Sequence, residues 1–422
     1  MWGESQWLWW VGVQFTRSVR AVGQDDVVID DASLVRAAFG DLPGADVSAI
    51  SPADRPTRRW LAGVVLGAQG RYAAAATLLG PLRAVRDPVL ASLAASTLAA
   101  HRRQLGGHVA ARRLDAEALT HLAQLGRPGV TRSVEELVLA EAAGVTESAA
   151  RVDALLGLAA DAVGLGRVDE ARRLLAAAER ELGLERQPER RGRPGRRGGA
   201  GETGPPPLPQ PADWRGQVRA GWVGAEIELA AGRAEAAVPL AEAAGRLART
   251  AGAARHVLKS DLVLGTALAV AGQAESGIGE VVAGSTVVGR DEDAAGSAIA
   301  RLPTCIALLG CVLNHTVDLG LLSLVWPAAL VLAQHAPDES AELLDWANNA
   351  LSCVLRAADP IGRRIAAASP WVPSALLHSG EPPNAAGWAK FLTDKAPDRV
   401  KVGAQASDRG CGTSLGCRKE SP

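Results

Sequence analysis

The strongest constraint on the fold is a set of segments with helical periodicity, each divided near its middle by one glycine. In "LGLAADAVGLGRVDEARRLLAAAERELG", residues 156–183, apolar residues recur at helical spacing on both sides of Gly166. The same arrangement recurs around further glycines, at Gly70, Gly106, Gly232 and Gly272. Because glycine adopts positive φ after a helix end without steric cost, each of these segments is predicted to be two helices joined at a turn.

Small residues accompany these glycines at fixed offsets. Seven positions before each glycine stand Gly63, Ala99, Ala159, Ala225 and Gly265. Five positions after it stand Ala75, Ala111, Ala171, Ala237 and Gly277. Small side chains let two helix backbones approach closely, so the pattern predicts antiparallel helical hairpins.

The spacing of the glycines indicates a repeat. It is 36 residues from Gly70 to Gly106 and 40 from Gly232 to Gly272. With these features, clearest over 56–86 and 152–183, the chain resembles the tetratricopeptide repeat family. The resemblance implies a right-handed α-solenoid of helical hairpins with a concave ligand-binding face. The large aromatic usual in the first helix is missing, with Arg59 and Asp261 in its place.

Composition agrees with an all-α fold. Ala and Leu dominate and aromatic residues make up only 4%, whereas a sandwich or barrel needs alternating β-branched and aromatic residues. The chain has 45 basic and 46 acidic residues, so its net charge gives no bias toward nucleic acid or anionic membranes.

Two sets of hairpins are predicted, at 33–184 and 215–378. Between them, residues 185–214 are rich in Arg, Pro and Gly, have almost nothing to bury, and are predicted to be a disordered linker. Residues 1–32 form an aromatic N-terminal segment, and residues 379–422 are predicted to be an irregular, largely disordered tail.

Two apolar stretches bear on membrane contact. The N-terminal run with Trp2, Trp7, Trp9 and Trp10 is interpreted as a capping helix, with a peripheral membrane anchor as the alternative. Residues 319–334 are too short to span a bilayer, which needs about 20 apolar residues, and are predicted to be a buried helix. The five cysteines, an odd number absent from the first 300 positions, favour reduced thiols and a cytoplasmic protein.

The sequence contains none of the motifs that encode common catalytic geometries. It has no P-loop, nucleophile elbow, zinc-protease histidine pair or paired CxxC. We therefore expect no catalytic residue, cofactor or metal, and a protein that is not an enzyme.

One segment suggests a different function. Residues 135–155 resemble a DNA-binding helix-turn-helix through Ala140, Gly144-Val145-Thr146 and Val152. The expected second helix opens at Glu147 and offers Arg151 as its basic residue. A transcriptional regulator is thus the alternative to a protein-interaction scaffold, and nucleic acid is the alternative partner to a protein or peptide.

The repeat resemblance also implies which residues face a ligand, because the inner face of each first helix lies at fixed offsets from the glycine. These residues are Trp60, Arg103, Asp153, Arg219, Trp222, Glu226 and Lys259. Tryptophans beside charges suit an extended peptide; the alternative is that Trp60 and Trp222 only fill space between repeats. Reversing the charge of Arg103 and Lys259 is expected to abolish partner binding without unfolding.

Overall fold

The computed structural model describes residues 29–123, 132–184, 214–283, 292–370 and 372–373; within 273–303 only the helical backbone is described. The described residues form α-helices and two short 3₁₀ helices and contain no strand, so the all-α prediction is confirmed. The helices of the first half are α2 (Asp31–Phe39), α3 (Pro56–Ala68), α4 (Tyr72–Leu79), η1 (Pro81–Ala84), α5 (Pro88–Gln104), α6 (His108–Leu122), α7 (Val134–Ala142), α8 (Glu147–Gly164) and α9 (Val168–Glu181). Those of the second half are α10 (Trp214–Ala230), α11 (Ala234–Thr250), α12 (Ala254–Ala283), α13 (Glu292–Asp318), α14 (Leu322–Ala333), η2 (Pro337–Glu339), α15 (Ser340–Arg356) and α16 (Pro360–Ala368).

Four of the five predicted glycine turns are present. Gly70, Gly106, Gly166 and Gly232 join α3 to α4, α5 to α6, α8 to α9 and α10 to α11, with φ of 76°, 73°, 71° and 72°. At the first turn the Arg71 N–H donates to the carbonyl of Leu66 at 2.8 Å, and that of Gly70 to Gly67 at 3.1 Å. These paired bonds satisfy carbonyls that the helix end leaves without partners, which only a left-handed residue permits.

The fifth predicted turn is wrong. Gly272 lies inside α12, which continues to Ala283. A glycine within a helix costs only roughly 0.5 to 1 kcal/mol relative to alanine, so it does not by itself end a helix that packs against neighbours. α12 contacts both α11 and α13, and the left-handed glycine of this region is Gly252, between α11 and α12.

The small residues lie at close helix contacts, as predicted, wherever their surroundings are described. The alanines at these offsets are fully buried: Ala75, Ala99, Ala111, Ala159, Ala171, Ala225 and Ala237. A Cβ at Gly63 would lie 2.6 Å from Leu79 Cδ2, and one at Gly265 would lie 2.7 Å from Leu309 Cδ2. Larger residues at these positions would therefore force α3 from α4 and α12 from α13.

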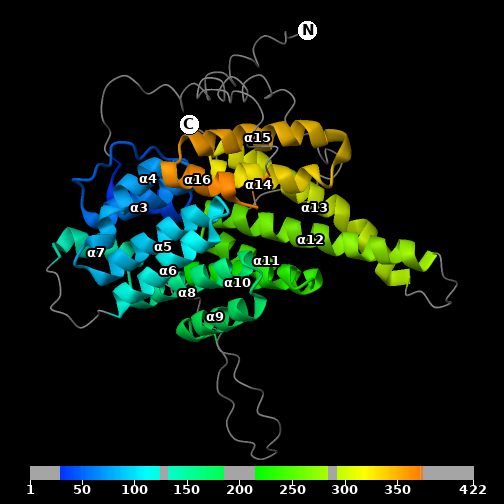
Figure 1. The fold of residues 1–422 in the computed structure, drawn as a ribbon, viewed down its shortest axis with the longest axis horizontal. Coiled ribbons are helices and arrows are strands. Elements are labelled where there is room, and N and C mark those ends of the chain that lie inside the picture. Colours follow the sequence, from blue (N-terminus) through cyan, green and yellow to red (C-terminus); the bar gives the residue numbers. More distant parts are fainter. Residues whose placement is uncertain (1–28, 124–131, 185–213, 284–291, 371, 374–422) are drawn as a thin grey trace, which may run out of the picture.

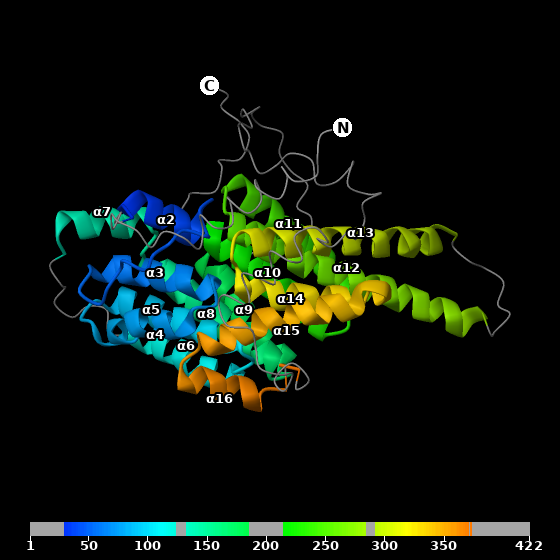
Figure 2. The same ribbon diagram turned by 90° about the horizontal axis from the view of Figure 1, so that it is seen from above.

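The hairpins pack in series and curve around a centre. We call α3, α5, α8, α10, α12 and α14 the inner helices, because each contacts the next in this order. α4, α6, α9, α11, α13 and α15 pack against them (Figure 1). The view from above shows α14 and α15 returning to the side of α3 and α4 (Figure 2).

The first and last hairpins meet, which distinguishes this array from an open solenoid. α14 contacts α3, where the Ser323 Oγ donates to the Ala68 carbonyl at 2.8 Å. The Ala73 N–H, at the start of α4, donates to the Ala357 carbonyl after α15 at 2.7 Å. Both ends of the last hairpin thus lie at the turn of the first, so the series of hairpins closes on itself. The tetratricopeptide identity itself stays a prediction.

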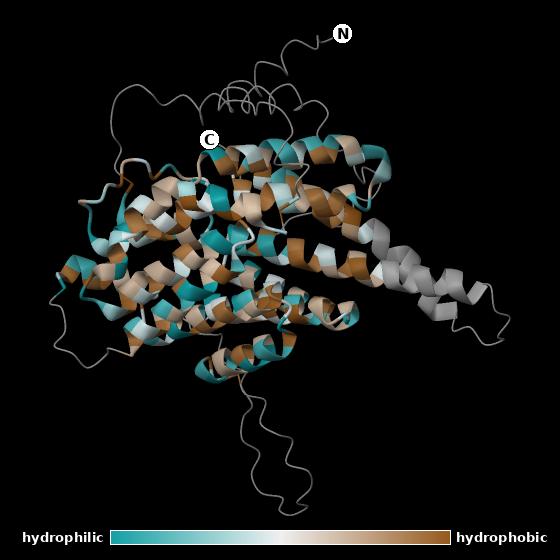
Figure 3. Ribbon diagram, in the orientation of Figure 1, coloured by the Kyte–Doolittle hydropathy of each residue, from teal (hydrophilic) through white to brown (hydrophobic). Residues whose placement is uncertain are grey.

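The apolar segment at 319–334 forms the buried helix that the sequence predicts. Its helix, α14, begins at Leu322 after the left-handed Gly320 and buries, among others, Val325, Ala328 and Leu332. No helix in the described part of the chain combines the length and apolar character needed to cross a membrane. Hydrophilic and hydrophobic residues are instead mixed along the helices (Figure 3).

Several sequence predictions lie outside the described residues. These are the tryptophan-rich start of the 1–32 segment, the linker at 185–214 up to Trp214, and the tail at 379–422. The cytoplasmic location likewise stays a prediction.

Candidate functional site

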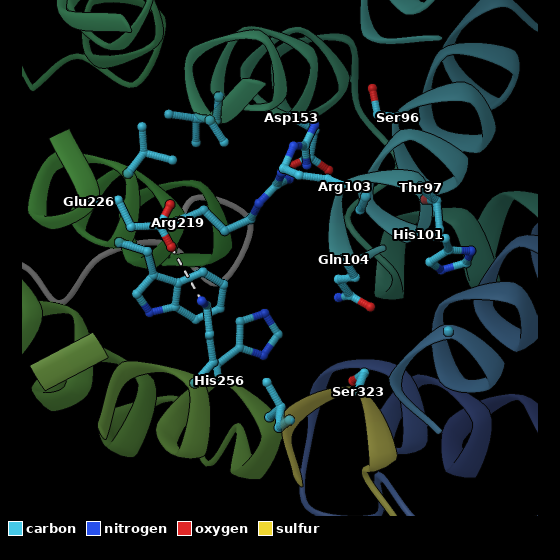
Figure 4. Close-up of a pocket in the computed structure, with 18 of the residues that line it drawn as sticks. Ser96, Thr97, His101, Arg103, Gln104, Asp153, Arg219, Glu226, His256 and Ser323 are labelled. Carbon is cyan, nitrogen blue, oxygen red and sulfur yellow. Dashed lines mark hydrogen bonds and ion pairs between the residues drawn. The ribbon is translucent and has the colours of Figure 1, made fainter. Parts of the chain in front are cut away.

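The inner helices surround a central cavity of about 660 Å³. Each of them contributes lining side chains, and Phe39 of α2 and His108 of α6 complete the wall. Figure 4 shows the helices on all sides, with His256 projecting toward the centre and Gln104 opposite it. Ligand pockets have volumes of about 300 to 1,000 Å³, so this cavity is of binding-site size.

The structure brings the predicted site residues together. Trp60, Arg103, Asp153, Arg219, Trp222, Glu226 and Lys259 all line the central cavity. They come from α3, α5, α8, α10 and α12 and are separated by up to 199 positions in sequence (60 to 259). Whether they bind a partner stays a prediction.

Most of these residues also link neighbouring inner helices. The Trp60 Nε1–H donates to Thr97 Oγ1 at 3.0 Å, between α3 and α5. Arg219 pairs with Asp153, between α10 and α8.

The contacts between α10 and α12 are of the same kind. The Trp222 Nε1–H donates to Ser260 Oγ at 2.8 Å, and Lys259 Nζ lies 3.2 Å from Glu226 Oε1. The two predicted tryptophans therefore pack between neighbouring inner helices and also line the cavity, and their binding of a peptide stays a prediction.

Arg103 is held by buried carboxylates. Its Nη2 lies 2.5 Å from Asp115 Oδ2 and its Nε lies 2.8 Å from Asp161 Oδ1, and both aspartate side chains are completely buried. Burial raises the pKa of Asp115, against the lowering effect of Arg103. A glutamate at position 103 would add a third carboxylate here, so the structure favours a loss of stability on this reversal, contrary to the expectation from the sequence.

Sequence reasoning missed two cations of the cavity wall. Arg215 donates from Nη1 to the Ala143 carbonyl at 2.6 Å, and its guanidinium carbon lies 4.1 Å from the centroid of the Phe39 ring. The Arg255 side chain has no ion pair or hydrogen bond with any residue that the structure describes, yet it lines the cavity. Burial, together with the charges of Arg219 and Arg215, lowers the pKa of Arg255 to about 10.

His256 lies beside these cations in an aromatic environment. Its ring stacks on Trp222, with centroids 5.5 Å apart, and meets the edge of Trp214 at 5.0 Å. The side chain is buried, and its Nδ1 has no hydrogen-bond partner in the described structure. Burial, and then the charge of Arg255, holds its pKa well below the ordinary value, so the ring is neutral at pH 7.

The opposite wall is formed by the end of α5. His101 stacks on Tyr72 with centroids 5.2 Å apart, and burial lowers the pKa of His101 to about 3. The Tyr72 hydroxyl, itself fully buried, donates to Gln104 Oε1 at 2.5 Å. His101 and His256 are thus neutral hydrogen-bonding groups at physiological pH.

A signal for the missed cations exists in the sequence. Arg215 and Arg255 stand four positions before Arg219 and Lys259, so each lies one turn earlier on the same helix face. Extending the inner-face offsets by one turn toward the N-terminus would have found both.

The cavity is suited to binding. Its polar groups are charged or neutral hydrogen-bonding side chains. Two of its hydroxyls donate to backbone carbonyls: Thr97 Oγ1 to that of Leu93 and Ser323 Oγ to that of Ala68. In the described residues no group of His, Cys, Asp and Glu side chains is placed to hold a metal ion.

The helix-turn-helix candidate at 135–155 corresponds to α7, the left-handed Gly144, and the start of α8. α8, which would have to enter a DNA groove, is an inner helix that contacts α5, α6, α9 and α10. α7 is fastened to α3, because Glu136 Oε1 accepts from the Thr57 N–H at 2.9 Å. Insertion of the whole of α8 into a DNA groove would therefore require these contacts to break.

Comparison with models of known protein families finds no match, and comparison with curated proteins finds none of significant similarity.

Proposed function

We propose that this protein is a non-catalytic interaction protein that takes a short segment of a partner protein into its central cavity. The observation that carries the proposal is the convergence of seven residues, chosen by repeat offsets alone, on one cavity of about 660 Å³. Tryptophan and arginine, which dominate binding energy at protein interfaces, are prominent among them.

The size of the cavity limits what can bind. A volume of this order suits a drug-sized ligand or a few residues of extended chain and excludes a folded domain. The inner helices enclose the cavity laterally, so a partner reaches it most easily with a chain end.

The regulator hypothesis has less support. Its recognition helix would be α8, which packs against four other helices, α5, α6, α9 and α10. A protein that binds its partner in the cavity would use residues of α8 that already line it, such as Asp153, and α8 would keep its contacts with the other helices.

The proposal is tested with a synthetic library of random heptapeptides, tethered through their N-termini and carrying free carboxyl ends. Binding of selected sequences to the purified full chain is then measured by calorimetry. The variant Ala160→Trp places an indole in the cavity, since Ala160 lines it, and is expected to weaken binding about 100-fold or more.

The matched control is Ala236→Trp, which adds the same side chain at an exposed position of the outer helix α11 and should leave affinity unchanged. Thermal unfolding checks that both variants fold, and Ala230→Trp, at the same cavity, replaces Ala160→Trp if that variant does not. Equal binding by the cavity and control variants, or no peptide binding at all, would contradict the proposal.

A further inference from the structure

The charges around the cavity are unevenly compensated. Arg219 is paired with Asp153, and Lys259 with Glu226. Arg103 lies between Asp115 and Asp161. Asp153 and Glu226 are the carboxylates that line the described wall, and each is already paired. Two cations of this wall, Arg215 and Arg255, therefore have no carboxylate partner.

The two cations differ in the interactions that their guanidinium groups make. Arg215 has a backbone carbonyl and the face of Phe39. Arg255 has neither among the described residues, and the nearby charges of Arg215 and Arg219 repel it. Arg255 is only partly buried, and its positive charge lies close to those of two other guanidinium groups. This repulsion is relieved when an anion enters the cavity.

A second group points to the same place. His256 follows Arg255 in the first turn of α12, and its buried imidazole lines the cavity with one nitrogen unpartnered in the described structure. A neutral imidazole can donate one hydrogen bond and accept another. The residue therefore places an unsatisfied imidazole beside the cation, while Trp222, Trp60 and Phe39 supply apolar surface around both.

From this arrangement we infer that Arg255 binds the C-terminal carboxylate of the peptide that enters the cavity. The inference rests on the proposed function and specifies the chemistry of its ligand. A guanidinium presents paired donors that match the two oxygens of a carboxylate. An N-terminal ammonium would be repelled by Arg215 and Arg255, so the carboxyl end of a chain enters.

The test compares each selected heptapeptide with its C-terminal amide. Losing a hydrogen bond to a charged group corresponds to roughly 10- to 100-fold in affinity, which is the loss expected on amidation. In Arg255→Gln the acid should bind about as weakly as the amide does to the unchanged protein. The control Arg246→Gln removes an exposed arginine of α11 that pairs with Glu242 and should retain the preference for the acid.

The carboxylate that binds Arg255 could also belong to an Asp or Glu side chain. A peptide with an amidated C-terminus and an internal Asp or Glu tests this alternative. If such peptides bind as tightly as those with free carboxyl ends, the C-terminal assignment is overturned. If amides and acids without internal carboxylates bind equally, the anion site is overturned while the proposed function stands.

Inorganic phosphate provides a probe that is independent of peptides. Millimolar phosphate should raise the thermal unfolding temperature of the unchanged protein and of Arg246→Gln, but not of Arg255→Gln. If phosphate does this and no peptide binds, the anion site is supported and the proposed function fails. If neither probe binds, both fail. The unfolding temperature of Arg255→Gln without ligand should equal or exceed that of the unchanged protein, whereas a structural role for Arg255 would lower it.

Discussion

Arg102 and Asp359 form an ion pair, with Nη2 and Oδ2 2.7 Å apart, that joins the second hairpin to the start of α16. Both side chains are largely buried, and Asp359 also caps α16 by accepting from the Gly362 N–H at 2.8 Å. One carboxylate thus fastens the end of the described helical array to its beginning.

Asp359→Ala removes both interactions. Breaking a buried pair and a helix cap should lower the free energy of unfolding by about 3 to 5 kcal/mol. Chemical denaturation measures this change, and Asp338→Ala, at an exposed acidic residue, is the control. Equal stability of the two variants would show that the closing contact contributes nothing.

Arg103→Glu and Lys259→Glu reverse the charges of two residues for which the sequence predicts the same effect, but the structure predicts different losses of stability. The first should lower the free energy of unfolding by about 3 to 5 kcal/mol, because it leaves Asp115 and Asp161 buried beside a third carboxylate. The second should cost about 1 kcal/mol or less, since Lys259 and Glu226 are each about one-third exposed (31% and 32%). Denaturation curves that show equal losses would contradict this assignment.

Gly67→Ala tests the close packing of α3 on α5. An added Cβ would lie 1.9 Å from His101 Nε2, so the variant should lose about 1 to 3 kcal/mol of stability through overpacking. Gly166→Ala meets no atom within 4 Å but has a φ of +71°, so it should lose about 1 to 2 kcal/mol from backbone strain alone. Gly166→Asn should recover part of that loss because asparagine tolerates this conformation, whereas Gly67→Asn should recover none.

The neutral His256 makes stability depend on pH. Its folded pKa lies below the unfolded value of 6.5, so below that pH the unfolded chain takes up a proton that the native state does not. Stability from this group is complete above pH 6.5 and falls by up to about 1.4 kcal/mol per pH unit below it. His101, with a pKa of about 3, acts in the same direction, whereas the raised pKa of Asp115 acts in the opposite one.

The difference between the unchanged protein and His256→Phe isolates this contribution. Phenylalanine keeps the aromatic contacts with Trp222 and Trp214 and cannot be protonated. Denaturation measures the unfolding free energies of both proteins at pH 7 and at pH 5. On going from pH 7 to pH 5, the unchanged protein should lose about 1 kcal/mol or more of stability relative to His256→Phe. Parallel curves would show that the pKa of His256 is the same in the native and unfolded states.

The sequence predicted the hairpins well because their determinants are local. A glycine such as Gly166 and an alanine such as Ala159 act on adjacent helices, so spacing along the chain is enough to locate them. Gly272 shows the limit: a glycine tolerated within a helix has the same sequence signature as one at a turn, and tertiary packing decides between them.

The cavity was predictable only in part. Inner-face offsets found Trp60 and Lys259 because these positions follow from helix geometry, and Lys259 was found although its reference glycine is not at a turn. The contact of Ser323 with Ala68 depends on the accumulated curvature of the whole array, which no local pattern encodes. The partners of Arg103 were missed for the same reason, since Asp161 lies 58 positions away.

The meeting of the first and last hairpins has a consequence for local dynamics. A linear row of repeats opens from its outermost units, because each of these has one neighbour to lose. Here α3 and α4 also rest on α14 and the residue after α15, so local opening at this end must break two interfaces. Amide hydrogens of residues 56–79 should consequently exchange with solvent as slowly as those of the hairpins farthest from either end.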